Sequence, residues 1–499
     1  MSIVLNAHAT GRAFTESITR EEQKSAGQFM TPPIIARFMA RRLVANFDHS
    51  TVRLLEPSAG AGVLVAAVVE ALLDKARRPK RIEILLYERD ARLITHLESL
   101  CDRLGNACAT AGIAFDRLIR NEDFLLSDLA IRGQPIDGLL SIANPPFFKL
   151  NKGTDERAKL HSYAVYGQPN IYGLFMAATA RLTPENGRWC FIAPRSWMSG
   201  QYFKAVRRTV LKHLQIDSLH AFENRRESFE EDSVLQETVI FWASGRRGNG
   251  HGLEVSFTSS IGVSDIDITN MRHIPFDRIV ASNDGSIVVP PSADSDVMDG
   301  WDATLATYGL KVSTGPVVAF RAENFITATR HPNTVPLLWM QHVGQQTLHW
   351  PIQKKSEFIL ANGASAWMLL PNAPMVVMRR FSPKEDPRRV TCAPYAGQLP
   401  GHRIGLENHL NYIHRPSGQM SVLEVRGLSA LLASRVVDAH LRRIAGSTQI
   451  NATDLRKLPL PSLALIEEIG RSISNKPALA EIDAITEQAI GLRSFRAAA

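Results

Sequence analysis

The chain has 499 residues, 45% hydrophobic and 21% charged, which is ordinary for a soluble globular enzyme of about two to four domains. Its net charge of +8 is a mild excess that favours a polyanionic partner without requiring one. The four cysteines form no CxxC pair and have no histidine at ligand spacing, which argues against a zinc site or a disulfide framework. Neither a signal peptide nor an apolar segment long enough to span a bilayer is recognisable, so we expect a cytoplasmic protein without metal or membrane.

From residue 51 to about 243, short apolar runs alternate with helical patterns, which predicts an α/β domain with a mostly parallel sheet and helices on both faces. The expected strands are 52–55, 82–87, 115–119, 137–142 and 188–193. The expected helices are 63–76, 91–104, 171–182 and 201–214. Two further runs, 216–222 and 234–242, have no long helix between them and predict a hairpin at one edge of the sheet.

The Gly- and Arg-rich stretch 244–253 predicts a domain boundary, so we expect one domain at 1–245 and another at 254–499. Beyond the boundary the alternation of strands and helices is lost, and Pro and Gly interrupt short β-like runs. A clear helix returns only at about 422–444. The second domain is therefore expected to be mixed α+β.

Acidic and glycine residues follow the first three predicted strands. Glu56 heads the turn Glu56–Gly62, in which glycines permit a tight turn and close approach of a ligand, although such a turn is also common in ordinary loops. Glu88 follows the second strand and Asp123 the third. A single acid at such a position is usually solvated surface, but three at the carboxyl ends of parallel strands indicate a ligand site.

The spacing in this turn discriminates between cofactors. A dinucleotide site would show G-x-G-x-x-G with an acid about 20 residues further on. Here Val65 occupies the third-glycine position, and Glu88 lies 26 residues (88 − 62) beyond Gly62. Glu56 would repel phosphate groups but suits a cation that carries an amino group. S-adenosylmethionine is such a ligand, because it has a sulfonium, an amino acid end, a ribose and an adenine but no phosphate.

The fourth strand ends in the tetrapeptide Asn144-Pro145-Pro146-Phe147. The exocyclic amine of a base is a poor nucleophile because its lone pair is delocalised into the ring. Asn144 Oδ1 and a backbone carbonyl of the rigid Pro-Pro segment could accept both N–H bonds and localise that lone pair. Phe147 could stack on the base, an interaction worth about 1–3 kcal/mol, once the base is flipped out of a duplex. The alternative is a strand terminator followed by a buried phenylalanine.

In this order, these residues resemble the amino-methylating DNA methyltransferases of the gamma class, and Gly27–Pro33 resembles the cofactor element ahead of the glycine turn in that class. Together with 143–150, 193–208 and 234–242, they are most similar to BsuBI/PstI-type modification methylases. The resemblance implies a class I S-adenosylmethionine-dependent methyltransferase fold, with a seven-stranded sheet, an antiparallel edge hairpin and a C-terminal target-recognition domain. It also implies methylation of adenine N6 in double-stranded DNA, in a prokaryote whose cognate restriction endonuclease is a functional partner.

The resemblance assigns roles by position. Residues that would flank the methionine part of the cofactor are Gln28, Phe29, Thr31 and Pro32. Residues that would hold its amino acid end are Glu56, Ser58, Ala59, Gly60 and Gly62. Glu88 would hold the ribose and Asp123 the adenine amine, with Asn144 also at the cofactor. The target adenine would be positioned by Asn144, Pro145, Pro146 and Phe147.

Three aromatic positions leave questions open. The family most often has Tyr where Phe147 stands here, so stacking survives and any role of a hydroxyl is lost. Phe148 or Trp197 could supply a second stacking face, but buried core is the favoured interpretation of each.

A basic cluster in the C-terminal half would contact DNA phosphates or guanines, unless it is a solvated hairpin. Its members are Arg379, Arg380, Lys384, Arg388 and Arg389. Polar residues in 407–415 and 441–462 could contact bases or merely shape turns. No single base contact can be assigned.

Three alternatives stay open: an RNA methyltransferase, a protein-glutamine methyltransferase, and a non-catalytic DNA-binding specificity protein. Glutamine methylases usually carry a helical substrate domain ahead of the glycine turn, where this chain has only about 50 residues. The intact set of acids and Asn144 counts against a non-catalytic relic. We expect no fused nuclease ahead of Gly27.

Overall fold

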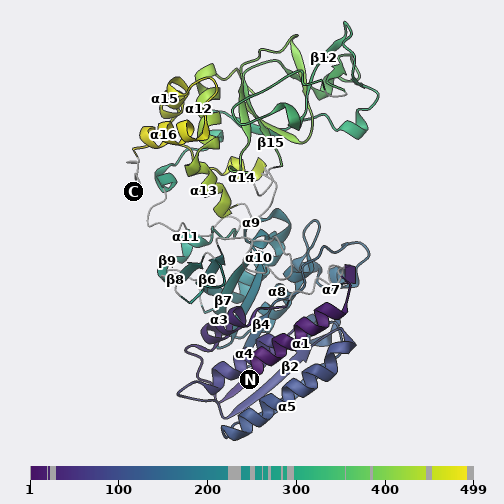
Figure 1. Ribbon diagram of the computed structural model, residues 1–499, viewed down its shortest axis with the longest axis vertical. Coiled ribbons are helices and arrows are strands. Elements are labelled where there is room, and N and C mark those ends of the chain that lie inside the picture. Colours follow the sequence, from purple (N-terminus) through teal and green to yellow (C-terminus); the bar gives the residue numbers. More distant parts are fainter. Residues whose placement is uncertain are drawn as a thin grey trace. The chain divides into compact units, whose positions relative to one another are not determined.

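The computed structural model describes residues 2–19, 21–22, 30–222, 238–247, 253–260, 262–267, 271–281, 285–288, 297–353, 356–381, 386–444 and 452–491. The chain divides into two compact units, Met1–Pro290 and Pro291–Ala499 (Figure 1). Within those ranges, no helix is both long enough and apolar enough to cross a membrane.

The first unit contains one sheet with the strand order β3-β2-β1-β4-β5-β7-β6-β8-β9. Its strands are β1 (Thr51–Glu56), β2 (Arg81–Tyr87), β3 (Ala114–Arg120), β4 (Leu139–Ala143), β5 (Arg188–Pro194), β6 (Leu214–Phe222), β7 (Thr238–Gly245), β8 (Glu254–Ser260) and β9 (Arg272–Pro275). Strands β1 to β5 pair with one another in parallel, and β7 lies antiparallel between β5 and β6. The expected alternation of strands and helices is therefore confirmed.

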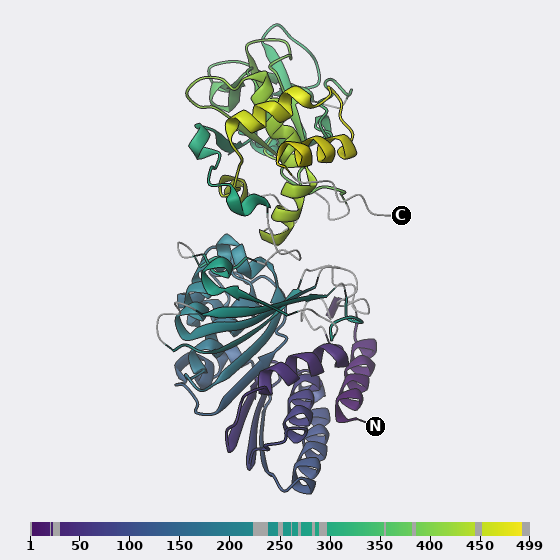
Figure 2. The ribbon, with the colours of Figure 1, turned by 90° about the vertical axis from the view of Figure 1, so that its left-hand side faces the viewer.

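Helices cover both faces of this sheet (Figure 2). One face carries α1 (Ile3–Ser17), α3 (Pro33–Val44), α4 (Val63–Leu73) and α5 (Ile94–Thr110). The other carries α6 (Asp128–Arg132), α8 (Ile171–Leu182) and α10 (Lys204–His213). The short helices of the unit are α7 (Glu156–Leu160), α9 (Ser196–Ser199) and α11 (Phe276–Ile279). Successive residues of the fully buried β4 enter the two opposite cores, as expected for a strand covered on both sides.

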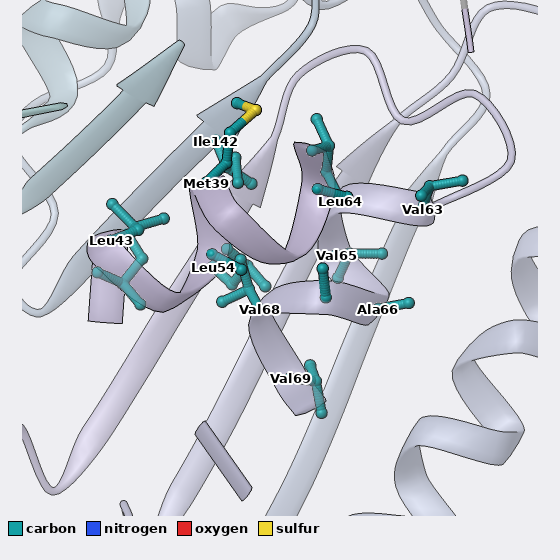
Figure 3. Packing of buried hydrophobic residues seen from close by; sticks show 14 of the residues in the cluster. Met39, Leu43, Leu54, Val63, Leu64, Val65, Ala66, Val68, Val69 and Ile142 are labelled. Carbon is teal, nitrogen blue, oxygen red and sulfur yellow. The ribbon is translucent and has the colours of Figure 1, made fainter. Parts of the chain in front are cut away.

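Helix α4 explains why the glycine turn is rigidly placed. Its sequence VLVAAVVEALL is apolar almost all round, which is typical of a helix enclosed by protein. In Figure 3, Val65 and Val68 of α4 and Met39 of α3 gather around Leu54 of β1. The helix that follows the turn is thus fixed by packing on several sides.

The expected hairpin is present, but it does not form the edge of the sheet. Strand β8 pairs in parallel with β6 and β9 pairs with β8, so the described part of the sheet has nine strands rather than seven. Val255 and Phe257 of β8 are buried in the core of the first unit. The first compact unit consequently extends to Pro290, beyond the boundary expected at 244–253. With only two apolar residues among its seven, β8 gave no clear signal in the sequence.

The second unit is mixed α+β, as expected. A four-stranded sheet has the order β10-β18-β15-β16 and a five-stranded sheet the order β11-β13-β12-β17-β14. The strands are β10 (Lys311–Thr314), β11 (Ile326–Thr327), β12 (Thr334–Leu338), β13 (Phe358–Leu360), β14 (Leu369–Pro371), β15 (Met375–Arg379), β16 (Cys392–Tyr395), β17 (Arg403–Leu406) and β18 (Leu410–His414). The helices are α12 (Val422–Ala433), α13 (Arg435–Ile444), α14 (Ala452–Arg456), α15 (Leu463–Ser472) and α16 (Leu479–Ala489). The single helix expected at 422–444 breaks at Ser434, whose backbone is extended (φ −70°, ψ 157°).

Two glycines allow α12 and α15 to touch through their backbones. A Cβ atom on Gly427 would lie 1.7 Å from the carbonyl oxygen of Ile466, and one on Gly470 would lie 2.1 Å from that of Leu423. Side chains at these positions would force the helices apart.

We predict that Gly427→Ala lowers the free energy of unfolding of the second unit by about 1–3 kcal/mol, the usual cost of overpacking. Gly300→Ala is the control, because a Cβ atom there meets no atom within 4 Å. Denaturant unfolding of the full chain measures both. Equal stability of the two variants would contradict the close helix contact.

Candidate active site

A pocket opens at the carboxyl ends of β1, β2, β3 and β4. Its lining includes residues expected at the cofactor or the target base, namely Thr31, Glu56, Ser58, Ala59, Gly60, Glu88, Asp123, Asn144 and Pro146. Further lining residues are Met30, Pro57, Ala61, Val63, Leu64, Tyr87, Arg89, Glu122, Phe124, Phe148, Arg157, Ile171 and Phe175. Residues separated by more than 100 positions in the chain therefore meet at one edge of the sheet, as the topology requires.

Four residues expected at the cofactor or at the target base do not line the pocket. Pro32 precedes α3 as its N-cap. Gly62, Pro145 and Phe147 are not among the residues that line the pocket. Gln28 and Phe29 fall outside the described residues, so their expected roles remain predictions.

The two glycines of the turn serve different needs. Both have positive φ, 54° at Gly60 and 78° at Gly62, where other residues are strained. A Cβ atom on Gly62 would lie 2.3 Å from Leu100 Cδ2, so this glycine lets the turn pack on α5. A Cβ atom on Gly60 would meet only Met30 Sδ, at 3.8 Å. Gly60 thus leaves open space on the side of the pocket.

Two buried carboxylates hold the turn in place. Glu56 Oε2 accepts a hydrogen bond from the backbone N–H of Val65 (2.9 Å). Glu88 Oε2 accepts one from Gly60 N–H (2.8 Å), and its Oε1 accepts one from Asp90 N–H (2.7 Å). Burial raises the pKa of Glu56 well above its ordinary value and also raises the pKa of Glu88. Such carboxylates are stabilised when a cation binds beside them.

The chemistry of this pocket fits S-adenosylmethionine. Acids line the pocket at several strand ends, which suits a cation and disfavours phosphate groups. Ser58 Oγ is buried and has no hydrogen-bond partner among the described residues, although buried hydroxyls normally have one. A polar ligand in the pocket would supply that partner. The residues Glu56, Ser58 and Gly60 are therefore suited to the amino acid end of the cofactor.

The tetrapeptide is joined to the N-terminal element through a side-chain hydrogen bond. Asn144 Nδ2 donates to Thr31 Oγ1 at 3.1 Å, and Thr31 is buried. Residues 113 positions apart are thereby held together. The sequence placed each residue at the site but did not predict this contact.

Phe147 packs outside the cofactor pocket. Its ring meets Tyr172 edge to face, with centroids 5.7 Å apart. Tyr172 stacks on Phe203 (5.1 Å), and its hydroxyl lies 2.8 Å from Ser196 Oγ. Phe147 is consequently supported by a fixed aromatic cluster that the sequence did not reveal.

The structure distinguishes the two other aromatic candidates. Trp197 is fully buried and packs edge to face on Phe241 (4.7 Å), so its interpretation as core is confirmed. Phe148 lines the pocket, with the guanidinium of Arg157 5.7 Å from its ring centre. Phe148 is thus half-buried, with one part packed on the core and another at the pocket, so its interpretation as fully buried core is wrong.

Asp123 has a partner that the sequence did not suggest. Its Oδ1 accepts a hydrogen bond from Leu125 N–H (3.0 Å), and its Oδ2 accepts one from Arg157 Nη1 (3.2 Å). Arg157 lies in α7, between the tetrapeptide and α8. Only the Asp155-x-Arg157 spacing of a capped helix start hinted that this arginine is fixed.

The basic cluster of the second unit is largely engaged within the unit. Arg388 forms an ion pair with Asp483, and its Nε donates to the carbonyl of Ala433 (3.2 Å). Arg389 is buried, and Arg379 Nε donates to the carbonyl of Val343 (2.6 Å). Arg380 Nη1 lies 3.5 Å from the carbonyl oxygen of Asn408. Lys384 falls outside the described residues, as do Thr448, Gln449 and Asn451 from the 441–462 segment. DNA contact by these residues remains a prediction.

The sheet order and this pocket define a class I S-adenosylmethionine-dependent methyltransferase. Residues 141–229 match the family described as Eco57I restriction-modification methylase. The chain is 29% identical over 480 residues to the type II methyltransferase M.PstI of Providencia stuartii, covering 93% of each chain. It is 31% identical over 464 residues to the type II methyltransferase M.BsuBI of Bacillus subtilis, covering 90% of each. The chain therefore belongs to the type II DNA methyltransferases of restriction-modification systems, and its cofactor is S-adenosylmethionine.

We predict that cofactor affinity rises with pH because of Glu56. A bound cation favours the ionised carboxylate, so binding releases a proton wherever the raised pKa keeps Glu56 protonated in the free protein. Glu56→Gln should bind more weakly and show a smaller pH dependence, since Glu88, whose pKa is also raised, still lines the pocket. Calorimetric titration with S-adenosylmethionine at several pH values measures both. Glu83→Gln, a strand glutamate outside the pocket, is the control, and an unchanged pH dependence in Glu56→Gln would contradict the role of Glu56.

In the protein without ligand, the contribution of Glu56 to the free energy of unfolding should instead fall as pH rises. A folded-state pKa above the ordinary value means that the folded chain holds the proton more tightly than the unfolded chain. The contribution of Glu56 to the free energy of unfolding is then fully present below the ordinary glutamate pKa and is lost as pH rises through the raised value.

Proposed function

We propose that this enzyme transfers the methyl group of S-adenosylmethionine to the N6 amine of an adenine flipped out of double-stranded DNA, as the modification enzyme of a type II restriction-modification system. A cognate restriction endonuclease is the functional partner. The observation that carries the proposal is Asn144, at the edge of the cofactor pocket, with its amide held by Thr31. An amide fixed in this way is suited to orient an exocyclic amine.

The amide orientation follows from its hydrogen bond. Because Asn144 Nδ2 donates to Thr31 Oγ1, the carbonyl oxygen Oδ1 points away from Thr31 and can accept an N–H of the substrate amine. The backbone carbonyl of Pro145 is the second acceptor, with its direction restricted by the adjoining proline ring. The cofactor supplies a methyl group activated by its sulfonium. Asn144 and Pro145 hold the amine nitrogen so that its lone pair faces that methyl group.

Phe147 provides the stacking face for the flipped base. Its edge-to-face contact with Tyr172 fixes the ring, so little side-chain freedom is lost when a base stacks on it. Its position outside the cofactor pocket is consistent with a face reserved for the substrate. The absence of a hydroxyl at this position leaves stacking as its contribution.

The assignment of adenine rests on the order of the elements. The cofactor residues come first, the tetrapeptide follows, and the second unit comes last, which is the order of the gamma class. Cytosine carries a similar conjugated amine, so the chemistry of the tetrapeptide alone would also suit N4 methylation. The second unit, residues 291–499 as the structure divides the chain, is proposed to select the target sequence.

We predict that the purified protein labels DNA with N6-methyladenine and that Asn144→Ala reduces the rate about 10²–10³-fold, the usual effect of removing one positioning hydrogen bond in an active site. Nucleoside analysis after incubation with labelled cofactor identifies the product. Cofactor binding is measured in parallel, so that loss of binding and loss of chemistry are separated.

Asn186→Ala is the matched control for Asn144→Ala. Asn186 precedes β5 at the other end of the strands and donates to Asp137 Oδ1 (2.6 Å). This variant should keep full activity. Label retained in Asn144→Ala would refute the proposed mechanism, and N4-methylcytosine as the product would refute the base assignment.

We predict that Phe147→Tyr keeps the rate within about threefold, because the stacking face is preserved, and that Phe147→Ala lowers it by roughly tenfold to a hundredfold. Phe203→Ala removes an aromatic contact of Tyr172 without altering the tetrapeptide, and it should cost less than Phe147→Ala. Single-turnover methylation rates decide the order. Equal losses of rate in Phe147→Ala and Phe203→Ala would show that Phe147 contributes only packing and does not stack on the base.

A further inference from the structure

The segment between the tetrapeptide and α8 is a loop whose two ends are tied together. Leu150 N–H donates to the carbonyl of Pro169 (2.9 Å), and Ile171 N–H donates to the carbonyl of Phe148 (2.9 Å). Lys149 and Asn170 form a bridge between these two contacts. Residues 150–169 therefore leave and re-enter the fold at one place, and they carry α7 between.

This segment is fastened to the turn after β3 at two points. Arg157 Nη1 donates to Asp123 Oδ2 (3.2 Å), and the buried His161 places Nε2 2.8 Å from the carbonyl oxygen of Leu125. Burial lowers the pKa of His161, so its ring is neutral near neutral pH. Segment 150–169 thus packs against the part of the pocket wall that contains Asp123.

Arg157 is held in a single orientation. Both oxygens of Asp155 accept from it, Oδ1 from Nε (3.0 Å) and Oδ2 from Nη2 (2.6 Å). Its Nη1 reaches Asp123, and its guanidinium lies 5.7 Å from the ring centre of Phe148. Only 16% of its side-chain surface is exposed. Arg157, Asp123 and Phe148 all line the pocket.

The acidic residues of the pocket differ in whether their hydrogen-bond partners are charged. The hydrogen bonds of Glu56 and Glu88 come from uncharged backbone N–H groups, so either carboxyl can pair with a bound cation in its ionised form. Asp123 has a positive partner in Arg157. A cofactor with a cationic amino acid end and an uncharged adenine matches this distribution, with the adenine beside Asp123.

We propose that Arg157 is a cofactor-positioning residue that holds Asp123 and Phe148 as the wall for the adenosine end and fastens segment 150–169 over it. The proposal rests on the proposed function and on the cofactor orientation that the family resemblance implies, with the amino acid end at Glu56 and the adenine at Asp123. By fixing one oxygen of Asp123, Arg157 sets the direction of the carboxylate that would accept the adenine amine. By lying beside the Phe148 ring, it sets the plane available for stacking on the adenine.

The chain offers a matched control in Arg92. Asp90 lies two residues ahead and accepts from Arg92 Nε (2.9 Å) and Nη2 (2.7 Å), as Asp155 does for Arg157. The Arg92 guanidinium also lies beside an aromatic ring, 5.0 Å from the centre of Phe14. Arg92 is absent from the pocket lining. Arg92→Gln therefore removes the same local interactions without altering the pocket.

The test compares Arg157→Gln and Arg92→Gln in the full-length protein without DNA. Calorimetry measures binding of S-adenosylmethionine and of 5′-methylthioadenosine, which keeps the adenosine but lacks the amino acid end. Arg157→Gln should weaken both ligands by the same factor, roughly tenfold, as expected for loss of one charge-assisted hydrogen bond. Arg92→Gln should bind both like the wild type, and Arg157→Lys should recover part of the loss.

Trypsin cleavage at the exposed Lys152 and Lys159 gives a second readout. S-adenosylmethionine should slow this cleavage in the wild type and in Arg92→Gln, but not in Arg157→Gln. If Arg157→Gln fails to fold, Arg157→Lys and Phe148→Leu take its place, and both should weaken methylthioadenosine.

Arg157→Gln that binds both ligands within twofold of the wild type would overturn the proposal, as would selective loss of S-adenosylmethionine alone. Should Arg157→Lys and Phe148→Leu be used instead, binding of methylthioadenosine as in the wild type would also overturn the proposal. A wild-type protein that binds neither ligand would instead refute the cofactor assignment.

Discussion

Parallel pairing of β1 to β4 is the constraint on which the site depends. It brings the four strand ends to one edge of the sheet, so that Glu56, Glu88, Asp123 and Asn144 line one pocket. Burial of the first two acids is costly, and hydrogen bonds from backbone N–H groups of the turn and of α4 offset part of that cost. The same hydrogen bonds shape the turn, so the groups suited to bind a cation also build its binding surface.

The pocket is completed by segments that lie outside the sheet. Thr31 comes from the N-terminal element and fixes the Asn144 amide, while Arg157 comes from the loop before α8 and is bonded to Asp123. The tetrapeptide Asn144–Phe147 takes part in the first contact, and the loop that follows it carries the second. Under the proposed function, the first contact would orient the substrate amine and the second the adenine end of the cofactor.

The local elements of the catalytic half could largely be predicted, because helical and strand periods are strong there. Helix α8 has the expected bounds, and the acids follow their strands as expected. The contacts Asn144–Thr31 and Arg157–Asp123 could not be predicted, because they join residues far apart in sequence. The basic cluster was predicted to contact DNA from its composition alone. Composition does not reveal that Arg388 pairs with Asp483, 95 residues away. Strand β8 has only two apolar residues, Val255 and Phe257, and β9 has only four residues, so neither gives a clear periodic pattern.

The most direct test of adenine modification is sequencing of modified bases in the genome of a methylation-free bacterial host that expresses this protein. The account predicts N6-methyladenine at one short recognition sequence, present throughout the genome and missing in a host that expresses Asn144→Ala. N4-methylcytosine at such a sequence, or DNA without modified bases from a host with folded protein, would contradict it.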